Sequence, residues 1–93
     1  MTEHRTIQWE GRDIRLSYTP RWATQIDHVE MHALDGAPLP VTQTGYRSHF
    51  FGHVEPILTM DAVEMMMRDW LDSEAAKPAW QEHVSDAQQL SLF

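Results

Sequence analysis

The sequence IQWEGRDIRLSY (residues 7–18) alternates apolar and polar side chains on both sides of a glycine-containing turn. Successive side chains of a β-strand point to opposite faces, so apolar residues two positions apart share one face. These apolar residues are Ile7, Trp9, Ile14, Leu16 and Tyr18. Gly11 lies between the two runs and suits a tight connection. The stretch therefore predicts an antiparallel hairpin, whose second strand we expect to end at Thr19-Pro20-Arg21.

Residues 28–33 continue the alternation, with Val29, Met31 and Ala33 on the face opposite to Glu30 and its neighbouring histidines. Asp35-Gly36 follows as a turn signal. Residues 38–42 then suit a short edge strand, where proline interrupts no ladder of hydrogen bonds. Together these runs predict an antiparallel β-meander of three to four strands.

The second half of the chain changes from strand periodicity to helix periodicity. Thr59 can cap a helix through its hydroxyl, and the helix dipole favours an acidic residue such as Asp61 in the first turn. One apolar stripe follows at helical spacing, formed by Met60, Val63, Met67, Trp70 and Leu71. The helix should end before Pro78. We therefore expect an α+β fold, in which the meander packs against one main C-terminal helix.

The length of the chain limits it to a single core. With 93 residues there is room for one small domain, which we place at residues 1–77. Residues 78–93 include Trp80, Val84 and Ala87 at helical spacing but are too few for a second core. We interpret this segment as a linker or short helix that ends in a flexible C-terminal tail.

Composition and charge exclude several classes of site. The chain has no cysteine, which excludes disulfides, thiolate zinc sites and thiol catalysis. Its formal net charge is −7, and most of the excess acid lies in the second half, which argues against direct nucleic-acid binding unless a local basic patch overrides it. No apolar run is long enough to span a membrane, and no signal-type stretch opens the sequence. We expect a cytoplasmic protein.

The last five residues carry the most specific motif. They are Gln89, Leu90, Ser91, Leu92 and Phe93. The pentapeptide QLSLF resembles, without a mismatch, the motif QL(S/D)LF by which bacterial proteins dock on the DNA polymerase sliding clamp. A chance match arises on the order of once per 10⁵ to 10⁶ positions. The resemblance covers these five residues alone, so it implies a partner and says nothing about the fold.

The residue types suit a docking peptide. Leu90, Leu92 and Phe93 offer apolar side chains to a pocket, and full burial of each is worth roughly 1.5–3 kcal/mol. Gln89 can form hydrogen bonds at the pocket rim, while Ser91 faces solvent. We expect micromolar or weaker binding, at about −8 kcal/mol or less. The resemblance implies a non-enzymatic accessory or regulatory protein, either a replication or repair adaptor or a competitor for the clamp pocket, with no cofactor and with its oligomeric state open.

Two weaker constellations give alternatives. Residues 44–53 combine polar and aromatic groups in an expected loop, where Tyr46, Arg47, His49 and Phe50 could form a recognition surface or could complete the core. A metal- or small-ligand-binding domain could instead use four imidazoles near Glu30. These belong to His28, His32, His49 and His53. Ser48 beside His49 is not a catalytic dyad, because neighbours in a strand point to opposite faces.

A wider resemblance adds no mechanism. The segments IRLSYTPRW (residues 14–22) and DHVEMHALDGAPLPVTQTGYRSHFFG (residues 27–52) are similar to a group of small bacterial proteins. No activity is established for that group. The resemblance therefore implies neither a substrate nor a catalytic residue.

Overall fold

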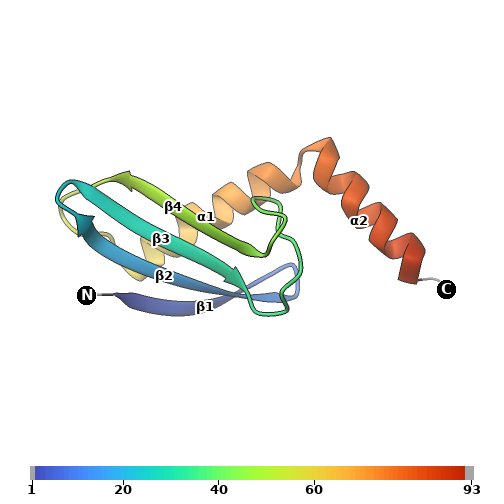
Figure 1. Ribbon diagram of the computed structural model, residues 1–93, viewed down its shortest axis with the longest axis horizontal. Coiled ribbons are helices and arrows are strands. Elements are labelled where there is room, and N and C mark those ends of the chain that lie inside the picture. The colour runs from blue at the N-terminus through green and yellow to red at the C-terminus, as the bar shows by residue number, and fades with distance from the viewer. Residues whose placement is uncertain (1, 92–93) are drawn as a thin grey trace.

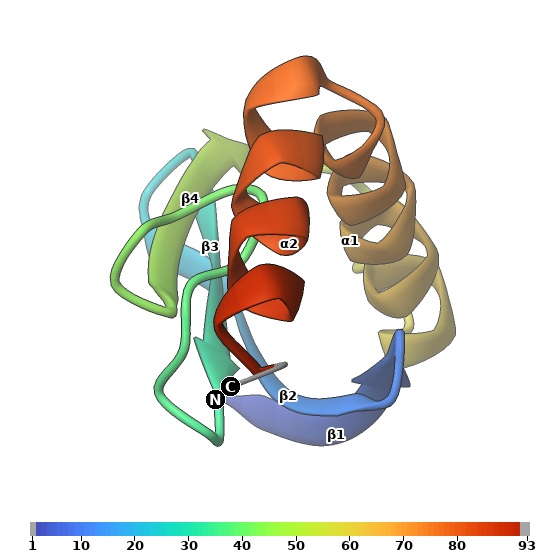
Figure 2. The same cartoon turned by 90° about the vertical axis from the view of Figure 1, so that its right-hand side faces the viewer.

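The computed structural model describes the backbone of residues 2–91 and the side chains of residues 2–86. It confirms an α+β fold with a four-stranded antiparallel sheet in the order β1-β2-β3-β4. The elements, in chain order, are β1 (Glu3–Trp9), β2 (Arg12–Ala23), β3 (Ile26–Ala33), β4 (Tyr46–Gly52), α1 (Met60–Ala75) and α2 (Pro78–Ser91). The sheet curves around α1, and its other face points away from both helices (Figures 1 and 2).

The predicted hairpin is confirmed, but its second strand is longer than expected. Glu10 and Gly11 both have positive φ angles (49° and 77°), as a tight two-residue hairpin turn requires. β2 does not end at Thr19-Pro20-Arg21; it continues to Ala23 through a shift of register between Thr19 and Ala23. Such a bulge accommodates the missing N–H of Pro20, so the proline bends the strand instead of ending it.

The fourth strand is not the one that we predicted. Residues 38–42 form only an isolated bridge between Leu39 and Thr42, whereas β4 lies at residues 46–52 and pairs with β3. The physical reason is that Pro38 and Pro40 lack the backbone N–H groups that donate the hydrogen bonds of a β-ladder, whereas β4 contains no proline. The expected loop around Tyr46 is therefore an edge strand.

Helix α1 forms as predicted and covers the apolar face of the sheet. The Thr59 side chain accepts a hydrogen bond from the backbone N–H of Ala62 (3.1 Å), and the helix ends before Pro78. Its buried stripe packs on the inward residues of β1, β2 and β3. Two side chains of β1 fix the helix ends: Arg5 Nη1 lies 2.6 Å from Asp61 Oδ1, and Trp9 Nε1 donates to Asp72 Oδ1 (2.8 Å).

A second helix follows where we expected a linker or short helix. α2 begins at Pro78, a favourable first helical position, and contacts the domain near its start, where the rings of Trp80 and Trp9 lie 6.4 Å apart. From there α2 projects beyond the end of the sheet (Figure 1). The radius of gyration is accordingly 14.6 Å, against about 12 Å for a compact chain of this length. In the part of the chain that the structure describes, no helix is long and apolar enough to cross a membrane.

Candidate functional site

The sheet presents a set of aromatic, imidazole and hydroxyl side chains on the face opposite to α1, which we call the open face. The register of β3 with β4 pairs His28 with Phe50, Glu30 with Ser48, and His32 with Tyr46. Because Val29, Met31 and Ala33 point into the core, the residues between them point outward. The open face is defined by seven residues: Trp22, His28, Glu30, His32, Tyr46, Ser48 and Phe50.

An aromatic cluster occupies one end of the open face. Trp22 and Phe50 remain 55% and 48% exposed, although their rings contact each other at 4.8 Å between centroids. The His28 ring stacks on Phe50 at 4.4 Å and is nearly buried by its neighbours. Arg21 has a φ of 51° within the irregular segment of β2, which turns Trp22 toward His28 and Phe50. Two large rings are thus held in place but not covered.

The middle of the open face is polar. Ser48 Oγ lies 2.5 Å from His28 Nε2, and Glu30 Oε1 lies 3.8 Å from the same nitrogen. The Glu30 carboxylate, together with burial, raises the pKa of the Tyr46 phenol. In a nucleophilic triad the carboxylate orients the base from its other nitrogen, an arrangement that differs from this one. The geometry suits hydrogen-bonded recognition better than activation of Ser48.

The four residues predicted as a recognition loop are divided between the two faces of β4. Tyr46 and Phe50 lie on the open face, where both are exposed. Arg47 and His49 lie on the side of α1, at 5.5 Å and 5.0 Å from the Trp70 ring. Burial and the nearby Arg47 charge lower the pKa of His49. Only half of the predicted surface is therefore available to a partner there.

The four histidines of the metal alternative do not converge. His28 and His32 lie on the open face, His49 packs against Trp70, and His53 follows β4 at the end of the sheet. Within the described residues, no group of three or more His, Asp or Glu side chains is arranged to hold a metal ion. Strand alternation separates the imidazoles, since adjacent registers face opposite sides of the sheet.

A buried carboxylate at the end of the sheet was not predicted. Asp27 is fully buried and accepts hydrogen bonds from the Tyr18 hydroxyl (3.1 Å) and the Arg21 backbone N–H (2.8 Å). His53 Nδ1 lies 2.7 Å from Asp27 Oδ1, and His53 Nε2 lies 2.7 Å from Glu55 Oε1. We call this group the Asp27 network. It consists of the backbone of Arg21 and the side chains of Tyr18, Asp27, His53 and Glu55.

The Asp27 network holds charged forms of its members. Hydrogen bonds to Glu55 and then to Asp27 raise the pKa of His53. Burial opposes ionisation of Asp27, but the hydrogen bonds from Arg21, His53 and Tyr18 outweigh it and lower the pKa of the carboxyl. The network therefore binds the segment after β4 to the bulge in β2, which carries Trp22. No spacing rule in the sequence connects Asp27 with His53.

The first three residues of the predicted docking peptide belong to the projecting helix α2. The backbone of Gln89, Leu90 and Ser91 forms the last turn of α2, while their side chains lie outside the described residues, as do Leu92 and Phe93. The C-terminal end of α2 is the part of the ribbon farthest from the sheet (Figure 1). The helix therefore directs this end of the chain away from the core.

Comparison with known proteins identifies one family. The family described as "KlcB third domain" matches residues 2–80, which include the sheet, α1 and the first residues of α2. The match ends before the C-terminal pentapeptide. No curated protein and no solved structure matches the chain.

Proposed function

The chain belongs to the KlcB third-domain family, and we propose that residues 89–93 recruit this family domain to the DNA polymerase sliding clamp. The observation that carries the proposal is the pentapeptide QLSLF, which agrees with the clamp-docking motif at every position. It lies beyond the residues that the family match covers. In this proposal the protein is a non-enzymatic accessory factor whose domain and docking peptide are separate modules.

The position of the peptide supports its accessibility. α2 projects from the domain, and residues 89–91 form its last turn. The last four carbonyl groups of a helix have no intrahelical donors, so the final turn unwinds at low cost. The peptide can then adopt the conformation that a partner's pocket requires without disturbing the sheet.

Titration of a purified bacterial sliding clamp tests the proposal. Leu92 and Phe93 each contribute roughly 1.5–3 kcal/mol when buried, so the double variant Leu92→Ala/Phe93→Ala should lose binding by more than about 100-fold. Isothermal titration calorimetry measures this loss directly. Ser91→Ala is the matched control, because this residue lies between the apolar positions and should bind like the wild type. Equal binding by the wild type and the double variant, or no binding by the wild type, would refute the proposal.

The exposed aromatic side chains favour an adaptor over a simple competitor. A competitor needs only the docking peptide, whereas this domain also presents the open face with half-exposed Trp22 and Phe50. Exposed aromatic groups of this size usually mark a contact surface. A primer-extension assay with clamp and polymerase distinguishes the two roles, because a competitor should lower synthesis at concentrations near its Kd for the clamp.

A further inference from the structure

We propose that β4 pairs with β4 of a second copy of this chain, so that two sheets join along this edge in an antiparallel dimer. The proposal goes beyond clamp docking and does not depend on it, since it concerns an edge of the sheet instead of the C-terminal peptide. β4 is the last strand of the sheet, with β3 on one side and, among the described residues, no strand on the other (Figures 1 and 2). Such an edge is a template for another strand unless the protein protects it.

The backbone groups along the free side of β4 belong to every second residue. The N–H of Ala33 donates to the carbonyl of Gly45 (2.7 Å), and the N–H of His53 donates to the carbonyl of Gln25 (2.9 Å). In an antiparallel pair such bonds recur at alternate residues. The odd-numbered residues of this strand therefore bond to β3, whereas the N–H and C=O groups of the even-numbered residues point away from it.

One of these outward positions is already occupied by the chain itself. The hydroxyls of Thr42 and Thr44 donate to the outward carbonyl of Tyr46, at 2.9 and 3.1 Å. Across residues 2–86, no hydrogen bond reaches the outward backbone groups of the remaining even-numbered residues of β4. These residues are Ser48, Phe50 and Gly52.

The free groups are symmetrical about Phe50, and a second β4 matches this symmetry. When Phe50 lies opposite Phe50 of the second copy, Ser48 lies opposite Gly52 and Gly52 opposite Ser48, so each free N–H meets a free carbonyl. The exposed apolar side chains have the same centre. Tyr46, Phe50 and Val54 follow at intervals of four residues and are 44%, 48% and 38% exposed. The same register therefore places Tyr46 opposite Val54 and covers apolar surface in both copies.

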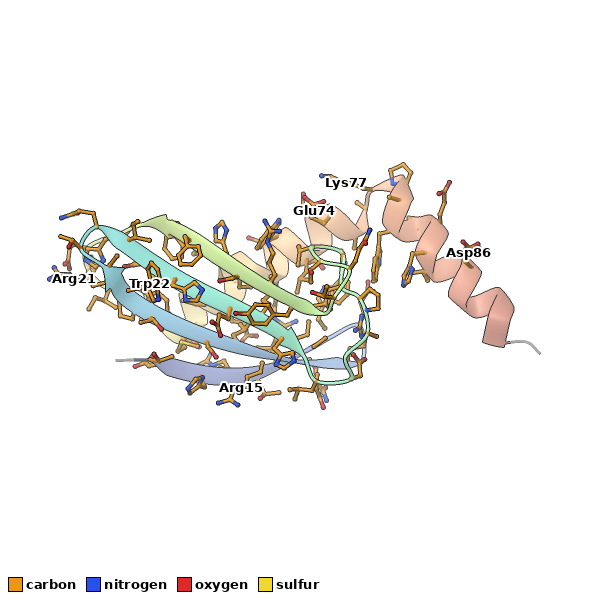
Figure 3. The ribbon with its side chains drawn as sticks, viewed as in Figure 1. Arg15, Arg21, Trp22, Glu74, Lys77 and Asp86 are labelled. Carbon is orange, nitrogen blue, oxygen red and sulfur yellow. The ribbon has the colours of Figure 1, made fainter. Side chains whose placement is uncertain are left out.

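The composition of the two edges favours β4 over β1. β4 contains neither proline nor lysine nor an acidic residue, the side chains that commonly protect an edge. Trp22 contacts Phe50 and extends its apolar surface over the same end of the open face (Figure 3). The apolar residues of β1, Ile7 and Trp9, are instead buried under α1. Pairing of β4 with β1 would join copies head to tail, whereas pairing of β4 with itself closes as a dimer.

The net charge of −7 opposes association of two copies, but little of it lies in β4. Arg47 is the one charged side chain of β4, and burial and the Arg47 charge lower the pKa of His49. Arg47 would lie opposite His53 of the second copy, an imidazole that Asp27 and Glu55 contact at 2.7 Å each. Salt screens repulsion between the more distant acidic residues, so dimerisation should strengthen with ionic strength. Because the interface is small, we expect a dissociation constant on the order of 100 μM.

Sedimentation velocity of the full chain, at about 10 μM to 1 mM in about 0.3 M salt, tests the proposal. Gly52→Pro and Gly52→Ala are a matched pair, because a Cβ at Gly52 meets no atom within 4 Å. Proline removes an outward N–H that bonds to nothing in the monomer, and alanine keeps it. Gly52→Pro removes two hydrogen bonds per dimer and should raise the dissociation constant at least about 5-fold, whereas Gly52→Ala should dimerise like the wild type. Circular dichroism verifies the fold of each variant.

Cysteine cross-linking tests the register, since the chain has no cysteine. Residues paired at the centre lie about 5.5 Å apart between Cα atoms, within the range of a disulfide. Phe50→Cys should therefore form a covalent dimer on mild oxidation faster than Thr6→Cys, which places the thiol on β1. The double variant Leu92→Ala/Phe93→Ala should dimerise like the wild type, which separates this proposal from clamp docking.

Five results would overturn the proposed dimer. They are a wild type that stays monomeric at the highest concentration, equal dissociation constants for Gly52→Pro and Gly52→Ala, cross-linking of Thr6→Cys as fast as that of Phe50→Cys, growth beyond a dimer, and loss of the dimer in the C-terminal double variant.

Discussion

Replacing Asp27 with alanine removes the centre of the Asp27 network. The carboxylate is fully buried and has three partners, the Tyr18 hydroxyl, the Arg21 backbone N–H and His53 Nδ1, at 3.1, 2.8 and 2.7 Å. Alanine leaves a buried hydroxyl and a backbone donor without an acceptor. Removing one partner of a buried ion pair costs about 3–5 kcal/mol. We expect Asp27→Ala to lower the free energy of unfolding by that amount, a large share of the about 5–15 kcal/mol typical of a domain.

Urea denaturation followed by tryptophan fluorescence measures this loss. With a slope of about 1–3 kcal/mol per M, the midpoint should fall by at least about 1 M. Tyr18→Phe is the matched comparison within the network, because it removes one hydroxyl and should cost about 1 kcal/mol. Asp35→Ala removes an exposed carboxylate that pairs with Arg12, and it should destabilise far less than Asp27→Ala. A loss for Asp27→Ala no greater than that for Tyr18→Phe would refute a central role of the carboxylate.

Three further predictions concern pH, the core and a glycine. Hydrogen bonding raises the pKa of His53 above its ordinary 6.5, so the contribution of this residue to stability should be complete below about pH 6.5 and lost as the pH rises through the folded-state pKa. The urea midpoint of the wild type should therefore fall over that pH range, and His53→Gln should remove the fall. A wild-type midpoint that stays constant over that range would contradict the prediction. Leu71→Ala should lower the free energy of unfolding by about 2–5 kcal/mol in the same assay, because Leu71 is fully buried, and a loss under 1 kcal/mol would contradict its packing. Gly45→Ala should lower the melting temperature more than its control Gly11→Ala. Both glycines have positive φ, but only at Gly45 would a Cβ lie 2.8 Å from the carbonyl oxygen of Ala37. Equal losses of melting temperature in the two variants would contradict this crowding.

The sequence predicts those elements whose two faces differ. In the hairpin of residues 7–18 and in residues 28–33, one face is buried, so apolar residues recur at every second position. The α1 stripe and its Thr59 cap are equally local signals, and the structure confirms both. In each case burial on one side produces a period that can be read without tertiary information.

The fourth strand was missed because neither of its faces is deeply buried. β4 lies at the edge of the sheet, so Tyr46 and Phe50 on one side and His49 and Phe51 on the other are all at least partly exposed. An edge strand of this kind shows no apolar–polar alternation. The Asp27 network was missed for a different reason, since Asp27 and His53 meet only after β3 and β4 have paired. The candidate site of this protein thus depends on the pairing register of the strands, and the local sequence pattern does not reveal that register.

The proposed docking peptide and the open face lie on different parts of the molecule, so one partner can bind at each of them. The docking peptide begins in the last turn of α2, a helix that leaves the domain at the end of the sheet, whereas the open face lies along the sheet itself. Occupation of a clamp pocket by residues 89–93 would therefore leave Trp22 and Phe50 uncovered. Tethering by the peptide would raise the local concentration of the open face near the clamp, so weak contacts between this face and a second partner would suffice for occupancy.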